Sequence, residues 1–120
     1  MKVQGLAQLA AVTGYSPPVL RLGIERLVTG VTAEALESWW TDLEGASRSV
    51  PGLVGIIAAG NIPGVALAPV VASLLAGSAV LVKSSMSEPL LMPAWHRALA
   101  AVAPHLADAC AIVPWPGGDE

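Results

Sequence analysis

The stretch that most constrains the fold of this chain runs from Ser49 to Val82 and contains no charged residue. Three apolar runs make up most of it, and they cover Leu53–Ile57, Val65–Ala76 and Ala79–Val82. The first and third runs are short and rich in branched aliphatic residues, as strands are, whereas the second has the length of a helix. Neither short run alternates with polar residues, which is typical of parallel strands covered on both faces. The stretch therefore predicts a strand–helix–strand unit.

The segment between the first strand and the helix contains four residues typical of turns, Gly60, Asn61, Pro63 and Gly64. In open α/β sheets, a turn at the carboxyl end of a strand is where ligands bind. Together with Pro69, the same residues interrupt the uncharged stretch, so neither half is long enough to cross a bilayer as a helix. A small membrane-associated protein stays an alternative, but these interruptions argue against insertion.

Two further residues set the limits of the predicted helix. Proline at position 69 removes the backbone hydrogen bond to Val65, so the helix must either begin late or bend. Gly77 follows the run and is suited to the left-handed conformation that ends many helices.

Composition indicates a single domain with much of its surface covered. Of the 120 residues, 54% are hydrophobic and only 12% are charged, against a usual charged share of about 25%. We therefore expect the remaining catalytic domain, a partner in a homo-oligomer, or lipid to cover apolar surface. The net charge of −3 offers no basic field to nucleic acid. A single cysteine excludes an internal disulfide, and the N-terminus lacks a secretory pattern, as in a cytoplasmic protein.

Residues 1–45 are predicted to form a helical segment, and residues 46–51 a small polar linker that ends in proline. The apolar residues of the helical segment recur at helical spacing, so we expect them in the core. The alternative for Trp39 or Trp40 is a place in the lining of an acyl pocket. The expected helices cover residues 4–12, residues 17–29 after an N-cap at Ser16, and residues 33–44 after an N-cap at Thr32.

Residues 52–120 complete the predicted fold. A helix is expected to begin at an N-cap, Ser87, and Cys110–Val113 has the composition of a third strand. Asp119 and Glu120 look like the first turn of a further helix. We therefore expect an α/β protein, in which N-terminal helices precede a parallel Rossmann-like βαβαβ unit that is a truncated part of a larger NAD(P)-binding domain. The inward face of the later helix is expected to hold Leu91, Trp95, Ala98, Leu99 and Val102.

Asn61 and Lys83 are the first candidates for a functional site. A turn-prone Gly-Asn pair is explained by backbone conformation, and the alternative is a carboxamide that donates to a developing oxyanion. Lys83 is the first charge after the uncharged stretch and lies at a strand end. It could hold a ribose or phosphate of a dinucleotide, or it could simply extend into water.

The cysteine and the histidines are weaker candidates. Cys110 begins an apolar strand with no base close in sequence, so we expect a buried structural thiol. His96 and His105 lack the spacing of metal ligands, so we expect no metal site and two solvated imidazoles.

Three segments carry a resemblance to a known family: AAGNIPG at 58–64, LLAGSAVLVKSS at 74–85, and PWPGGDE at 114–120. Together they resemble the cofactor-binding segment of the aldehyde dehydrogenase superfamily. The forms AGNIP and PWPGGDE are closer to its fatty acyl reductase branch, the LuxC-type acyl-CoA reductases. The resemblance covers roughly residues 51–120 well and the N-terminal third only weakly.

The resemblance implies an oxidoreductase that converts a fatty acyl-CoA to an aldehyde. A cysteine attacks the thioester, and a nicotinamide cofactor then reduces the acyl-enzyme. Asn61 matches the asparagine that polarises the reacting carbonyl. The family nucleophile lies far downstream, and no position here matches it, so this chain alone is expected to be inactive. Another NAD(P)-dependent aldehyde dehydrogenase and a non-catalytic nucleotide-binding module stay as alternatives.

The resemblance also implies a cofactor site. Lys83 matches the lysine that binds the adenosine ribose, but Met86 stands where the family usually has an acid. Because hydroxyls at Ser84 and Ser85 suit a 2′-phosphate, we expect NADPH, with NADH as the alternative. Gly117 could let the backbone approach the cofactor, or it could belong to a plain turn.

Overall fold

The computed structural model describes residues 3–45 and 49–116, with the side chains of Val3 and Gln4 left out. Six helices and three strands occur in these ranges, and the strands form one parallel sheet in the order β1-β2-β3. The predicted α/β class, with N-terminal helices before a parallel βαβαβ unit, is confirmed. The elements are α1 (Val3–Thr13), α2 (Pro17–Thr29), α3 (Ala33–Glu44), β1 (Leu53–Ile57), α4 (Leu67–Leu75), β2 (Ala79–Ser84), α5 (Leu91–Val102), α6 (Pro104–Asp108) and β3 (Cys110–Pro114).

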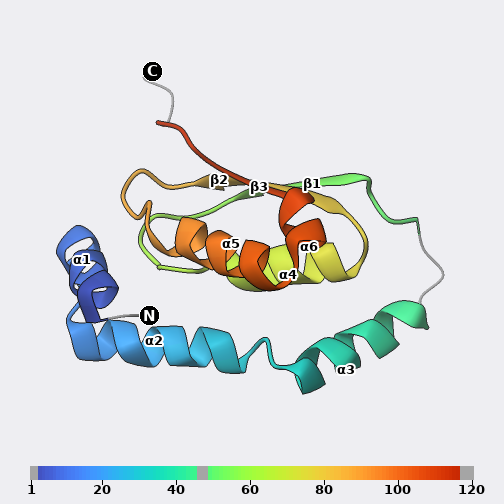
Figure 1. Ribbon diagram of the computed structural model, residues 1–120, viewed down its shortest axis with the longest axis horizontal. Coiled ribbons are helices and arrows are strands. Elements are labelled where there is room, and N and C mark those ends of the chain that lie inside the picture. Colours follow the sequence, from blue (N-terminus) through green and yellow to red (C-terminus); the bar gives the residue numbers. More distant parts are fainter. Residues whose placement is uncertain (1–2, 46–48, 117–120) are drawn as a thin grey trace.

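The three helices of the βαβαβ unit lie on one face of the sheet (Figure 1). The two crossovers run in the same direction across the sheet, from β1 to β2 and from β2 to β3. Crossovers of the usual right hand then bring α4 and α5 to the same side. Helices α1, α2 and α3 form an outer layer beyond them (Figure 1).

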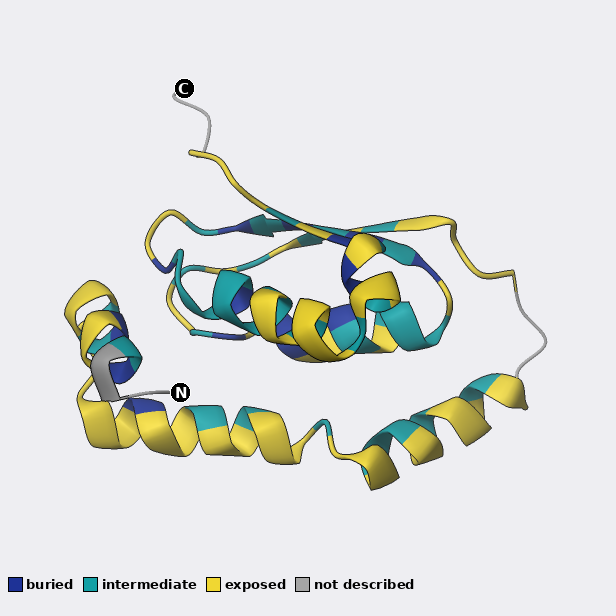
Figure 2. Cartoon of the chain, in the orientation of Figure 1, coloured by how far each residue is buried: buried dark blue, intermediate teal, exposed yellow. Residues whose placement is uncertain are grey.

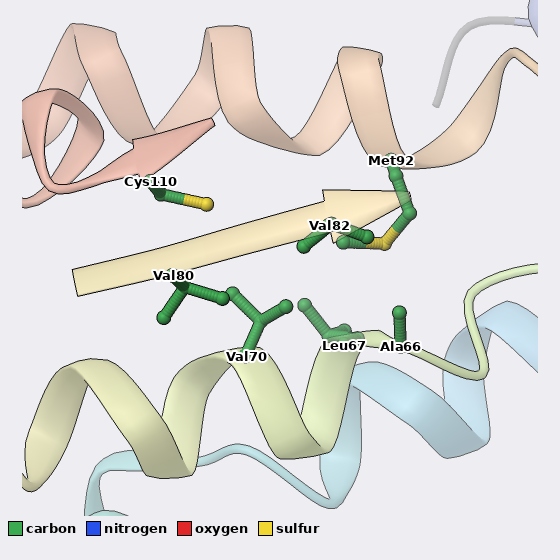
Figure 3. Packing of buried hydrophobic residues seen from close by; sticks show 7 residues of the cluster. All are labelled: Ala66, Leu67, Val70, Val80, Val82, Met92 and Cys110. Carbon is green, nitrogen blue, oxygen red and sulfur yellow. The ribbon is translucent and has the colours of Figure 1, made fainter. Parts of the chain in front are cut away.

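The core lies between the sheet and the helices of the βαβαβ unit. Val80 and Val82 alternate along β2 and point toward the helices, where Val70 of α4 and Met92 of α5 meet them (Figure 3). Val70 and Val82 are fully buried. Burying such a side chain contributes about 1.5–3 kcal/mol, so this contact fixes the position of β2 under the helices.

The opposite face of the sheet is uncovered within the described residues. Leu53 and Ile57 of β1 are 63% and 83% exposed, and Val113 of β3 is also exposed. Both crossover helices lie on one side, so the described residues cover only one of the two faces that the apolar strands were expected to bury. The apolar strand sequences nevertheless match a sheet whose second face also has a partner.

The N-terminal helices pack less closely than their sequence suggested. Leu6, Leu9 and Leu20 form a small buried cluster between α1 and α2. In α3, all of whose residues are described, none is buried, and Trp40 is exposed. The expectation that the apolar face of α3 lies in the core is wrong for this structure, in which the outward faces of α2 and α3 are largely exposed (Figure 2). The N-cap at Thr32 is confirmed, since its hydroxyl accepts from the Ala35 N–H at 3.3 Å.

Helix α4 begins late and ends before a left-handed glycine. The helix begins at Leu67, so Pro69 lies in the first turn, where no intrahelical bond is lost. Gly77 has a φ of +93°, which confirms the left-handed residue expected after the helix. No helix in the described ranges is long and apolar enough to span a bilayer.

The start of α5 differs from its prediction. The helix begins at Leu91 rather than after Ser87, and the carboxylate of Glu88 accepts from the N–H groups of Leu90 and Leu91, both at 2.8 Å. Glu88 is buried by this capping role. Met92 is buried and faces the core, whereas Val102, which was expected to point inward, is 82% exposed, so that part of the prediction is wrong.

The third strand is confirmed at Cys110–Pro114. The short helix α6 lies directly before it. Asp119, Glu120 and half of the predicted linker, residues 46–48, lie outside the described residues.

Candidate active site

Strands β1 and β2 end side by side, and their ends form the candidate site. The register pairs Ile57 with Lys83, and the Ala58 N–H donates to the Lys83 carbonyl at 2.9 Å. Because the strands are parallel, the Gly60–Gly64 turn and the segment after Ser84 leave the same edge of the sheet. This is the edge at which open α/β sheets bind ligands.

Gly60 brings these two segments into close contact. A β-carbon at this position would lie 2.9 Å from the β-carbon of Ser85 and 3.1 Å from that of Ser87. The Ser85 hydroxyl in turn accepts from the Ser87 N–H at 3.0 Å. Only glycine therefore allows the turn to lie directly on the serine segment.

Asn61 is exposed in the middle of the turn. Its backbone carbonyl accepts a hydrogen bond from the Tyr15 hydroxyl at 2.9 Å, while its carboxamide has no hydrogen-bond partner among the described residues. The φ of Asn61 is not positive, and the left-handed residue of this turn is Gly64, at +74°. A need for left-handed backbone therefore does not explain an asparagine at this position.

Lys83 lies on the uncovered face of the sheet. Its Nζ is 5.8 Å from the centroid of the Trp115 ring, within the range of a cation–π interaction. No sequence pattern indicated this contact, although the parallel register of Lys83 with Val113 places Trp115 just beyond the strand ends. Lys83 and Asn61 thus share one edge of the sheet, but the Asn61 turn is held on the side of α1 and α2 by Tyr15.

Ser84 and Ser85 have different surroundings. Ser84 is only 1% exposed, and its hydroxyl has no hydrogen-bond partner within the described ranges. It lines a cavity of about 10 Å³ beside Glu88 and Met92, which is about the volume needed for one water. Ser85 is half-buried against Gly60, and Gly117 lies outside the described residues.

Cys110 is buried at the opposite, amino end of the sheet, where β3 begins. Desolvation raises the pKa of its thiol above the usual 9.0. A protonated thiol at the wrong edge of the sheet is not placed for nucleophilic attack. The prediction of a buried structural cysteine is confirmed.

The histidines do not form a metal site. His96 is half-buried, and its Nε2 lies 3.1 Å from the carbonyl oxygen of Ala107 in α6, so the expectation of a solvated imidazole is wrong. His105 is exposed, as expected. Among the residues that the structure describes, no three His, Cys, Asp or Glu side chains gather as metal ligands would.

A pocket of about 350 Å³ adjoins the Asn61 turn, and sequence analysis did not predict it. Its walls come from α2 and from the turn, which are far apart in sequence. The lining is apolar except for the Tyr15 hydroxyl and the Arg26 guanidinium. It consists of Tyr15, Val19, Leu20, Gly23, Ile24, Arg26, Leu27, Ile62 and Pro63.

Comparison with known proteins identifies a family that matches nearly the whole chain. Residues 7–120 match the family described as acyl-CoA reductase (LuxC). No significant match was found among curated proteins or among solved structures. The match includes α2, the Asn61 turn, all three strands and the segment after Lys83. The chain therefore belongs to the LuxC family of acyl-CoA reductases.

Proposed function

We propose that this protein is the cofactor-binding part of an NADPH-dependent reductase of the aldehyde dehydrogenase superfamily, which converts a fatty acyl-CoA to an aldehyde. The family supplies the reaction class and the acyl-CoA substrate. The observation that carries the proposal is the exposed carboxamide of Asn61, at the carboxyl edge of a parallel sheet, which makes no hydrogen bond to any described residue.

The proposed reaction has two chemical steps. A cysteine thiolate adds to the thioester carbonyl, and the CoA thiolate leaves to give an acyl-enzyme. NADPH, when bound, supplies the hydride that reduces this second thioester, so the aldehyde and the enzyme thiolate are released. Both steps place negative charge on the carbonyl oxygen.

Asn61 would stabilise that charge. Its carboxamide N–H groups are not engaged by the described residues, and the Tyr15 hydrogen bond fixes the backbone that carries them. Removing a donor aimed at an oxyanion typically costs about 10²–10³ in rate. The amide would act on the oxygen of the reacting carbonyl in both steps.

Lys83 and the residues after it would hold the adenosine half of the cofactor, with contributions from Ser84, Ser85 and Gly117. The residues present fit a 2′-phosphate, since Lys83 is cationic and Met86, which is exposed, brings no repelling carboxylate. Ser84 is buried in the present arrangement, so its hydroxyl would need a path through the small cavity that it lines.

The nucleophile would come from residues outside this chain. Cys110 is buried and protonated at the far edge of the sheet, so it does not supply the thiolate. The catalytic domain, or a second copy of the protein, would also cover the apolar face formed by Leu53, Ile57 and Val113.

The reaction itself is tested by mixing the complete reductase with a fatty acyl-CoA and NADPH. Aldehyde and oxidised cofactor should form in equal amounts, and a thiol-blocking reagent should stop both. A protein that binds NADPH but transfers no hydride to any acyl-CoA would instead be a non-catalytic nucleotide-binding module, and the proposal would be wrong.

A further inference from the structure

We propose that the pocket between α2 and the Asn61 turn binds the hydrocarbon chain of the acyl-CoA, and that Gly23 sets the chain length it accepts. This inference rests on the proposed function and adds a binding site and a specificity-determining residue to it. The pocket volume of about 350 Å³ lies within the range of small-molecule sites, about 300–1,000 Å³.

The lining suits a hydrocarbon and little else. Of its polar groups, the Tyr15 hydroxyl already donates to the Asn61 carbonyl. Arg26 carries the remaining charge at the rim, and its aliphatic stem can lie along apolar surface while the guanidinium stays in water. A nucleotide or sugar would leave its polar groups without partners in such a pocket, which costs binding energy.

Several apolar side chains of the pocket walls are exposed, because no other described residue covers them. Val19 is 55% exposed and Ile62 is 52% exposed, although both belong to the pocket. Covering such side chains with an alkyl chain contributes about 0.8 kcal/mol per buried methylene. The exposed walls are therefore where a fatty acyl chain gains the most from binding.

The pocket adjoins the proposed reaction centre. Ile62 and Pro63 directly follow Asn61 and line the pocket, and Tyr15 both lines it and holds the Asn61 backbone. A thioester carbonyl at the Asn61 carboxamide would therefore have its alkyl chain at the pocket. The same turn would then contact the alkyl chain and polarise the carbonyl.

Helix α2 and the turn also approach each other directly beside the pocket. Leu27 lines the pocket, and its Cδ1 lies only 2.6 Å from where a β-carbon on Gly64 would be. This contact joins the two walls. An alkyl chain in the pocket would therefore lie along α2, between Tyr15 and Leu27.

Gly23 is in the middle of that space. It lies within α2 and lines the pocket, and a β-carbon built on it meets no atom within 4 Å. A side chain here would enter open volume without a clash, and a helix interior favours almost any side chain over glycine. Leucine at position 23 should therefore shorten the pocket and leave the fold intact.

The test measures binding of S-tetradecyl-CoA and S-hexyl-CoA to the protein by calorimetry. These thioethers have no carbonyl, so binding is read without turnover. Gly23→Leu should weaken S-tetradecyl-CoA at least about tenfold, the equivalent of about two methylenes excluded, and leave S-hexyl-CoA unchanged. Gly23→Ala should give a smaller change in the same direction.

Val28→Leu is the matched control, because it adds bulk to an exposed position of the same helix outside the pocket. It should change neither affinity. Equal affinities of wild type and Gly23→Leu for the long thioether, or equal losses for both thioethers, would overturn the inference. A change in oligomeric state caused by Gly23→Leu, with no change in affinity for the long thioether, would also overturn it, because the pocket would then be occupied by another protein chain. A chain-length effect without aldehyde formation would leave this inference standing and contradict the proposed function.

Discussion

The hydroxyl of Tyr15 donates a hydrogen bond to the backbone carbonyl of Asn61 at 2.9 Å, across 46 residues of sequence. This bond ties the junction of α1 and α2 to the turn at the carboxyl edge of the sheet. Within the described part of the chain, it is the one hydrogen bond that links Asn61 to the N-terminal segment. The N-terminal layer thereby takes part in positioning the candidate site.

Removing this bond should loosen the turn. Tyr15→Phe keeps the ring in the pocket wall but deletes the donor, and because the bond is exposed we expect a loss of about 0.5–1 kcal/mol in the free energy of unfolding. Urea unfolding measures the loss. A free energy of unfolding unchanged from wild type, together with unchanged turnover of the complete reductase, would mean that the bond does not hold the turn.

Glu88 should stabilise α5 through its two capping bonds. Glu88→Ala leaves the N–H groups of Leu90 and Leu91 without their acceptor, and should lower the free energy of unfolding by about 1–2 kcal/mol. Ser87→Ala is the control: it removes the residue that the sequence pattern favoured as the cap, and should change stability by less than about 0.5 kcal/mol. The reverse order of effects would restore Ser87 as the cap.

Gly60 should tolerate no side chain while Ser85 is present. Gly60→Ala places a β-carbon 2.9 Å from the β-carbon of Ser85, and such overpacking typically costs about 1–3 kcal/mol. Ser85→Gly in the same protein removes one of the two clashing groups and should recover part of the loss. Additive losses in the double variant, measured by chemical unfolding, would show that the two residues do not meet.

Cys110 should react slowly and should make stability fall at high pH. Burial raises the pKa of its thiol above 9.0 in the folded protein, so the folded state holds a proton that the unfolded state releases. Stability is therefore complete below pH 9.0 and decreases above it, toward the raised folded value. Alkylation by iodoacetamide should be at least about tenfold slower than in urea. A fast, single-exponential reaction of the native protein would contradict this burial.

The strands were predictable because their apolar runs are short, rich in branched residues and bounded by breakers, and Leu53–Ile57 matches β1 residue for residue. The Thr32 cap was predictable because it depends on neighbouring positions only. The start of α5 was not predictable in the same way. Ser87 has the residue type of an N-cap, but the N–H groups of Leu90 and Leu91 donate to the carboxylate of Glu88.

Features that depend on how distant segments come together could not be predicted from the sequence. The uncovered face follows from both crossovers lying on one side, which a strand's own residues do not encode. The pocket needs α2 and the Asn61 turn side by side, and the Lys83–Trp115 contact needs the register of β2 with β3. Lys83 could be chosen from the sequence because it lies at the end of a predicted strand, and Asn61 because its turn resembles that of a known family.

The most direct test of the proposed chemistry is the single-turnover rate of aldehyde formation by the complete reductase carrying Asn61→Ala, measured together with its Kd for NADPH. The rate should fall by about 10²–10³ while the Kd changes less than about threefold, because the carboxamide acts on the reacting carbonyl and not on the cofactor. A variant that keeps the wild-type rate, or that loses rate only in proportion to weakened NADPH binding, would contradict the role assigned to Asn61.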